Sequence, residues 1–152
     1  MIGETYEEDA LTRDFTMNAL YFDVLSRTII DPMDGAKDIS SRTIRPILDD
    51  CDFIFSDKVR VIRALRLACC LNFELSSDIS SHFRNIEDKH LFNSMKVGKL
   101  EYQKILSTNH LFSFLSRLIE FELIWHYPYN INFKKFNHSS YIKRLLTIAS
   151  KH

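Results

Sequence analysis

Apolar residues recur at helical spacing through the middle of the chain. At about 100° per residue, the stretch 56–71 collects its apolar side chains on one face, and charged side chains occupy the rest of the circumference. The pattern predicts a helix over 56–71, with Ser56 as N-cap and Asp57 favourably placed beside the helix N-terminus. The apolar face consists of Val61, Ile62, Leu65, Ala68 and Cys69.

A different pattern occupies the first fifty residues. The run 16–24 alternates and is rich in aromatic and β-branched residues, which predicts a strand. A second strand is expected over 28–31 after a turn at Ser26–Arg27, so the two strands form a hairpin. The other expected elements are a short helix over 7–14, a Pro/Gly loop over 32–40 and an extended stretch over 43–47.

Beyond residue 75 the sequence predicts helices almost throughout. The chain has only three glycines and three prolines, so turns are few and long helices are favoured. A long loop is expected over 127–137, and amphipathic helices over 77–85, 88–107, 109–125 and 138–150. The predicted fold class is mainly α, with a small N-terminal α+β piece followed by an all-helical part.

Composition narrows the choice of partners and compartment. The 152 residues carry 20 Lys+Arg against 20 Asp+Glu, so no overall charge draws the chain to nucleic acid. Any affinity for RNA would have to come from a local patch or from parts outside this sequence. The odd number of cysteines, without a spaced framework, argues for a reducing compartment, and we expect a cytoplasmic protein. We find no zinc-type cluster, no signal peptide and no membrane-spanning stretch, and therefore expect no membrane partner.

One group of polar residues with candidate chemistry lies in DALTRDFTMNAL. Arg13 and Asp14 end the expected short helix, and Asn18 follows on the expected strand. A guanidinium, a carboxylate and an amide gathered at a strand entry suit a nucleotide, with Arg for phosphate and Asp for a ribose hydroxyl. The same residues also fit an ordinary helix-to-strand junction with a local Arg13–Asp14 pair, and the residues alone favour that interpretation.

A second group lies on the predicted helix SDKVRVIRALRLA. Asp57 and Arg60 are i,i+3 neighbours that can hold each other in place and offer an acceptor and donors side by side. Such an edge can hydrogen-bond the Watson–Crick face of a base. The alternative is a solvated helix face with a surface ion pair worth about 0–1 kcal/mol. By itself this segment favours the solvated helix face. Residues 29–45, taken alone, would be an ordinary connection between a hairpin and a helix.

Taken together, three segments resemble the class II nucleotidyltransferases, the family of bacterial poly(A) polymerases and CCA-adding enzymes. That family carries RRDFTxNA, then a flexible element resembling DxxGGxxDLxxxxIR, then EDxxRxxRAxRFA. The corresponding segments here are TRDFTMNA (12–19), DPMDGAKDISSRTIR (31–45) and SDKVRVIRALRLA (56–68). The resemblance covers about residues 3–75, and 85–124 looks like the helical neck of the family.

The resemblance implies nucleotide-binding roles for six residues of this chain. Three would help hold the sugar and phosphates of the incoming nucleotide. Two would form a protein template that reads its base, and a third would support that template or face the phosphates. The first group is Arg13, Asp14 and Asn18, and the second is Asp57 and Arg60 with Arg63.

The resemblance also implies a domain organisation. Residues 1–50 would be the C-terminal part of a nucleotidyltransferase head with short strands, and 51–126 a helical neck that contains the base-reading helix. Residues 127–152 would be a loop and terminal helix of a shortened body. The segment 34–38 would be a springy link between head and neck.

The chain departs from the family pattern at several positions. Thr12 replaces the first arginine of RRD, and Ser56 replaces the glutamate of EDxxR. Leu67 replaces the phenylalanine after the last arginine, and the second glycine of the flexible element is absent. Together these changes suggest drift, specialisation or loss of activity.

Catalysis in the family needs Mg²⁺ held by paired carboxylates, which follow a glycine-rich segment early in the head. The sequence contains no such segment. The formal Asp-x-Asp within 49–52 lacks the glycine-rich lead, and we interpret it as a polar turn. We therefore expect no catalytic residue and no metal ligand in this chain, and no activity of the chain alone.

The resemblance implies a part of an enzyme that extends RNA 3′ ends, with ATP as substrate, Mg²⁺ as cofactor and RNA as partner. The stretch GETYEEDALTRDFTMNALYFD looks more like poly(A) polymerases, so AMP addition is favoured over CCA addition. Three accounts stay open: a fragment of an active enzyme, one half of a split enzyme completed by a separate head subunit, or a non-catalytic relative that binds RNA or protein.

Overall fold

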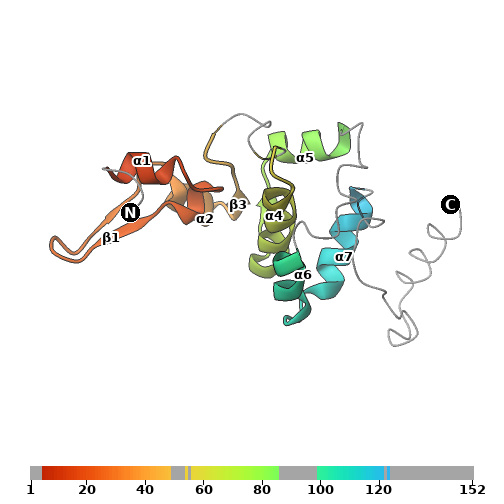
Figure 1. Ribbon diagram of the computed structural model, residues 1–152. Coiled ribbons are helices and arrows are strands. Elements are labelled where there is room, and N and C mark those ends of the chain that lie inside the picture. The colour runs from red at the N-terminus through yellow and green to blue at the C-terminus, as the bar shows by residue number, and fades with distance from the viewer. Residues whose placement is uncertain (1–4, 49–53, 55, 86–98, 122, 124–152) are drawn as a thin grey trace, which may run out of the picture.

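The computed structural model describes residues 5–48, 54, 56–85, 99–121 and 123, and its elements form an N-terminal part and a helical part (Figure 1). The N-terminal part contains helix α1 (Tyr6–Ala10), the 3₁₀ helix η1 (Thr16–Asn18), strands β1 (Tyr21–Asp23) and β2 (Thr28–Ile30), and helix α2 (Gly35–Ser40). The helical part contains β3 (Thr43–Ile44), α4 (Lys58–Leu71), β4 (Glu74–Leu75), α5 (Ser77–Asn85), α6 (Lys99–Leu106) and α7 (Leu111–Glu120). The described residues are thus mainly helical with two short sheets, which agrees with the expected fold class.

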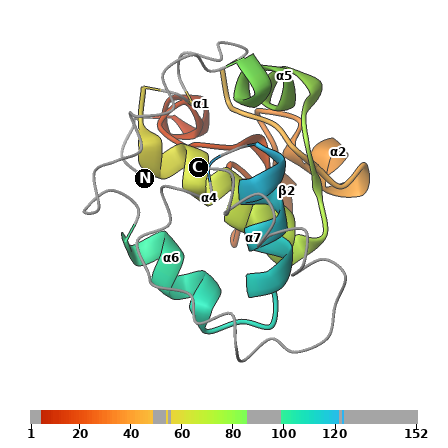
Figure 2. The same cartoon turned by 90° about the vertical axis from the view of Figure 1, so that its right-hand side faces the viewer.

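Helix α4 lies at the centre of the hydrophobic core. Its predicted apolar face is buried, and its most exposed member, Cys69, has only 5% of its surface accessible. Helices α6 and α7 pack on α4 and on each other (Figure 2). Burial of this face favours the helix far more than the intrinsic helix propensity of its residues does. The helix predicted over 56–71 is confirmed in type and position.

The predicted N-cap of α4 is wrong by one residue. Asp57, not Ser56, is the N-cap, and its carboxylate accepts a hydrogen bond from the Val59 amide at 2.8 Å. Both residue types are good N-caps, so the choice depends on which one reaches the first turn. The helix ends at Asn72, which adopts the left-handed conformation with φ of 54° that commonly terminates helices.

The predicted hairpin is confirmed. Strands β1 and β2 pair antiparallel with Tyr21 opposite Ile30, and the hairpin points away from the helices α4 to α7 (Figure 1). The first half of the strand expected over 16–24 is wrong, because Thr16 begins the 3₁₀ helix η1. Its amide donates to the carbonyl of Arg45 at 3.1 Å and its hydroxyl donates to Asp38, so tertiary hydrogen bonds override the local alternation.

The expectation of a plain loop over 32–40 is also wrong, because this stretch contains helix α2. Asp31 supplies the cap that a short helix needs: its carboxylate accepts hydrogen bonds from the amides of Gly35 at 2.7 Å and Ala36 at 2.9 Å. Asp34, which precedes the helix, is left-handed with φ of 55°. The turn signals in the sequence therefore mark the entry to α2.

The later elements match the predictions as far as the structure describes them. Helix α5 has the predicted bounds, and α6 and α7 lie within the helices expected over 88–107 and 109–125. Strand β3 falls in the extended stretch 43–47 and pairs with β4 in parallel. The loop expected over 127–137, the helix over 138–150 and both domain limits lie outside the described residues. Within the described residues, no helix is long and apolar enough to cross a membrane.

The contact between α2 and η1 generates a prediction about Gly35. A Cβ atom at this position would lie 2.3 Å from the carbonyl oxygen of Thr16 and 2.6 Å from Leu20 Cδ1. Backbone has to move to relieve this overlap, so we expect Gly35→Ala to lower the free energy of unfolding by about 1–3 kcal/mol, measured by urea denaturation. Ser40→Thr adds one methyl group to an exposed position of the same helix and should change the free energy of unfolding by under about 0.5 kcal/mol. Equal stability of the two variants would contradict the close packing of α2 on η1.

Candidate functional site

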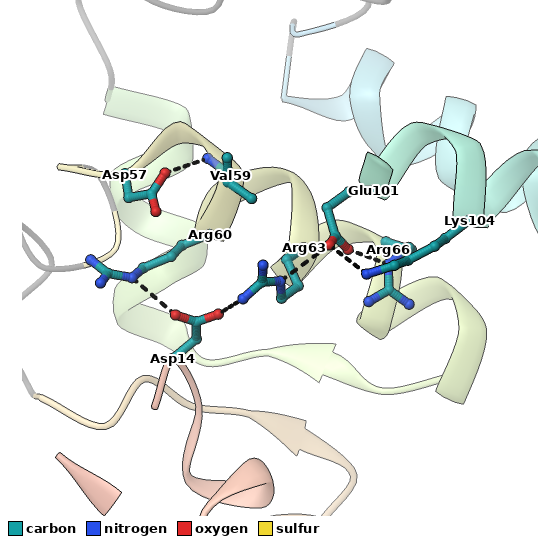
Figure 3. Close-up of polar contacts among 8 residues, drawn as sticks. All are labelled: Asp14, Asp57, Val59, Arg60, Arg63, Arg66, Glu101 and Lys104. Carbon is teal, nitrogen blue, oxygen red and sulfur yellow. Dashed lines mark hydrogen bonds and ion pairs between the residues drawn. The ribbon is translucent and has the colours of Figure 1, made fainter. Parts of the chain in front are cut away.

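The carboxylate of Asp14 connects the N-terminal part to helix α4 (Figure 3). Its Oδ1 accepts a hydrogen bond from Arg60 Nε at 3.0 Å, and its Oδ2 contacts Nη1 of Arg63. The next residue, Phe15, is fully buried and its backbone bridges to Pro46. Because the backbone is held on that side, the carboxylate is fixed against α4, with 12% of its side chain exposed.

A second carboxylate meets α4 from the other side. Glu101 on α6 accepts hydrogen bonds from Arg66 Nε at 2.7 Å, Lys104 Nζ at 2.8 Å and Arg63 Nε at 3.4 Å. Its side chain is only 3% exposed. Arg63 therefore lies between the two carboxylates of Asp14 and Glu101, as Figure 3 shows.

The arginines of α4 and the two acids form an ordered network of charge. Arg60, Arg63 and Arg66 are spaced three residues apart, which puts neighbouring guanidinium groups along one side of the helix. Ion pairs with Asp14 and Glu101 hold these three cations and Lys104 in place. A fixed surface of this kind attracts an anionic group such as phosphate.

Two pKa shifts follow from this network. Burial alone would lower the pKa of Arg63, but the charges of Asp14 and Glu101 outweigh it and leave that pKa raised. Burial alone would raise the pKa of Glu101, but hydrogen bonds from Lys104 and Arg66 outweigh it and leave that pKa lowered. Both side chains therefore carry their charges at neutral pH.

The other residues of the predicted site have different surroundings. The Asp57 carboxylate faces the Val59 amide, whereas the Arg60 guanidinium faces Asp14, so the two side chains have separate partners (Figure 3). Asn18 is exposed at the end of η1. The structure thus brings Asp14, Arg60 and Arg63 together, and the base-reading role of Asp57 and Arg60 stays a prediction.

The prediction of a local ion pair between Arg13 and Asp14, as in an ordinary helix-to-strand junction, is wrong. Arg13 instead forms an ion pair with Asp9, with Nη2 and Oδ2 2.6 Å apart. Glu101 was not predicted as a site residue, although the sequence carries a signal for such an acid. Three closely spaced arginines on a helix need counter-charges from another segment once they are partly buried.

Side chains that can ligate a metal do not cluster among the described residues. These residues contain no group of three or more His, Cys, Asp or Glu side chains placed to hold a metal ion. The acidic run 49–52 lies outside the described residues. We therefore assign no step of a reaction to a metal held by the residues described above.

Comparisons with known proteins agree with the sequence motifs. Residues 1–45 match the family model of the poly(A) polymerase head domain. The chain is 34% identical over 100 residues to the CCA-adding enzyme of Pediococcus pentosaceus, a match that covers 66% of this chain and 23% of that enzyme. It is 33% identical over 119 residues to the poly(A) polymerase I of Salmonella typhi, which covers 77% of this chain and 25% of that enzyme. The chain thus spans about a quarter of the length of these curated relatives.

Solved structures give the same likeness in three dimensions. The Bacillus stearothermophilus CCA-adding enzyme in complex with CTP superposes with a TM-score of 0.69 at 32% identity, over 80% of this chain and 30% of that one. A tRNA nucleotidyltransferase complexed with a primer tRNA and an incoming ATP analog gives 0.72 at 26% identity, over 86% of this chain and 40% of that one.

The buried position of Glu101 leads to a prediction for stability. Glu101→Ala leaves Arg66, whose side chain is 15% exposed, without its carboxylate partner. We expect the free energy of unfolding to fall by roughly 3 kcal/mol, because removing one partner of a buried ion pair strands the other charge. Glu120→Ala is the matched control, since its pairs with Arg84 and Arg117 are exposed and 3.5 Å long, and it should cost under about 1 kcal/mol. Chemical denaturation measures both, and an equal loss would mean that the Glu101 network is not buried in solution.

The lowered pKa of Glu101 leads to a prediction for pH dependence. A carboxyl group whose pKa is lower in the folded than in the unfolded chain stabilises the fold above the unfolded-state pKa, about 4.3. That stabilisation is lost as the pH falls through the lower, folded-state pKa. Glu101→Gln keeps the side-chain volume, so the gap in melting temperature between wild type and variant should shrink below about pH 4. Circular dichroism melts between pH 7 and pH 3 test this, and a gap that stays constant would refute it.

Proposed function

This chain belongs to the nucleotidyltransferase family that contains the poly(A) polymerases and the CCA-adding enzymes, and we propose that it takes part in adding nucleotides to RNA 3′ ends. The observation that carries the proposal is the Asp14 bridge to Arg60 and Arg63. It joins the motif TRDFTMNA to the helix SDKVRVIRALRLA, so the two segments that resemble the family most closely form one polar surface.

In this proposal the arginine side of α4 recognises the nucleotide. Reading the edge of a base needs donors and acceptors that are fixed before the nucleotide arrives, because misplaced groups lose both rate and selectivity. Asp14 and Glu101 provide that fixation for Arg60, Arg63 and Arg66 from two sides. The fixed guanidinium groups support binding of the triphosphate, because they can donate charge-assisted hydrogen bonds to phosphate oxygens.

The substrates follow from the same proposal. Two solved relatives hold CTP or an incoming ATP analog, and one of these also holds a primer tRNA. For this chain we propose ATP as the nucleotide and an RNA 3′ end as the acceptor, because the stretch GETYEEDALTRDFTMNALYFD is more similar to poly(A) polymerases. The metal-binding carboxylates would come from a head segment outside the residues described above, and Mg²⁺ held there would neutralise charge on the triphosphate. The cytoplasmic location stays a prediction.

The proposal is tested by supplying that head segment. We would join the head segment of poly(A) polymerase I from a relative to this chain and incubate the folded product with labelled RNA and ATP or CTP. Long tails formed from ATP on any RNA support poly(A) addition, and a stop after C, C and A on tRNA supports CCA addition. A folded product that extends no RNA with either nucleotide contradicts the proposal and favours a binding role.

The base-reading role of Arg60 is tested in the same assay. Arg60→Ala should lower the preference for ATP over CTP about tenfold, the effect of losing roughly 1.4 kcal/mol of discrimination. Arg60→Lys keeps a positive charge beside Asp14 but lacks the planar fork, so it should retain the fold and lose the preference. Arg84→Ala is the control, because Arg84 is 60% exposed and pairs with Glu120. An unchanged preference in both Arg60 variants would remove Arg60 from the template.

A further inference from the structure

The carboxylate of Asp9 is fully buried at a point to which neither the motifs nor the proposed function assigns a role. Its side chain is 0% exposed, and its Oδ2 accepts hydrogen bonds from Arg13 Nη2 at 2.6 Å, Arg13 Nε at 3.2 Å and Tyr21 Oη at 2.8 Å. A buried carboxylate is tolerated only where donors compensate the loss of water. Here both donor groups belong to other segments of the N-terminal part.

The three side chains converge from separate elements. Asp9 lies in the last turn of α1, Arg13 in the turn that follows, and Tyr21 at the start of β1. The ring of Tyr21 packs on the ring of Tyr6, with centroids 5.1 Å apart, and on the small cluster that contains Ala10. The Tyr21 hydroxyl is therefore held in place by packing, and it holds Asp9 in turn.

Arg13 is hydrogen-bonded along one edge of its guanidinium group. Nε and Nη2, which form that edge, both donate to Asp9, whereas Nη1 has no acceptor among the described residues. The side chain is 42% exposed, so its far edge lies open to solvent. The hydrogen bond that Arg13 donates to Asp9, followed by the interaction with Tyr21, raises the pKa of Arg13, so the group is always charged.

We propose that Asp9 and Tyr21 are positioning residues that hold the Arg13 guanidinium by one edge and present the other edge to a phosphate group of the incoming nucleoside triphosphate. This inference rests on the proposed function, because it takes a phosphate as the ligand of Arg13. The gain in binding affinity comes from ordering the Arg13 side chain before the phosphate binds. A free arginine loses its rotamer freedom when it binds, whereas an arginine already held has lost it during folding.

The first experiment measures whether Arg13 is held. The whole chain is labelled with ¹⁵N-arginine, and the Nε–H signal of Arg13 is identified by its loss in Arg13→Lys. The Nε–H proton of Arg13 should exchange slowly with water. Tyr21→Phe removes only the hydroxyl that supports Asp9, and Asp9→Asn removes the charge. We expect both variants to speed the exchange at least about fivefold. Tyr6→Phe removes a hydroxyl from the adjacent ring, which is not bonded to Asp9, and should leave the exchange unchanged.

The second experiment measures how the hydrogen bonds of Asp9 and Tyr21 affect the binding of triphosphate. Inorganic triphosphate is titrated into the same samples at a temperature at which circular dichroism shows every variant folded. Tyr21→Phe should weaken the binding about threefold to tenfold, the size expected when one long side chain has to be ordered on binding. A merely structural role would lower the melting temperature without changing the dissociation constant.

The outcomes separate the two proposals. If the wild-type chain binds triphosphate and both Tyr21→Phe and Asp9→Asn bind it equally well, the positioning role is overturned and the proposed function stands. If the Arg13 signal of the wild-type chain exchanges as fast as that of a solvent-exposed arginine, the positioning role is overturned as well. If the wild-type Arg13 signal does not respond to triphosphate, the phosphate-binding role of Arg13 in the proposed function falls together with this inference.

Discussion

The ion pairs of Asp14 connect the N-terminal part to the helical part. They link residues that are 46 and 49 positions apart in the sequence. A carboxylate that is 12% exposed has lost most of its water, and so have the guanidinium groups of Arg60 and Arg63. Desolvation consumes much of the attraction in such pairs, so their net stabilisation is small. Their larger effect is on specificity, because any other docking of residues 14–19 on α4 would separate the Asp14 carboxylate from the guanidinium groups of Arg60 and Arg63.

The same bridge is compatible with a nucleotide at this surface. The resemblance assigns Asp14 to the sugar of the nucleotide, yet its two oxygens already accept hydrogen bonds from arginines. A carboxylate has more lone pairs than these two bonds use, and a guanidinium has more N–H donors than it gives here. A ribose hydroxyl and a base can therefore join the network without breaking it. Glu101 holds Arg63 from the opposite side, so the nucleotide binding that we propose would not have to order that side chain.

The sequence predicted the elements that depend on local pattern and missed those that depend on distant partners. The helix over 56–71 follows from periodicity, whereas its cap at Asp57 was misplaced because two capping residues are adjacent. Helix α2 was missed because the carboxylate of Asp31 caps it across a Pro-containing turn, and η1 because Thr16 bonds to segments more than twenty residues away. In the site, the motif pointed to Arg60 and Arg63, but the pair between Arg66 and Glu101 forms only when α6 packs on α4.

The order of Arg13 and Asp14 in the chain is itself a structural requirement. The side chains of these two residues have different partners: Asp9 for Arg13, and Arg60 with Arg63 for Asp14. Exchanging the two residues would place an arginine against the arginines of α4 and a carboxylate against the buried Asp9. Both contacts would then be repulsive in a partly desolvated setting, where like charges interact strongly. The dipeptide therefore fixes at one point both the docking of the N-terminal part and the direction in which Arg13 presents its open edge.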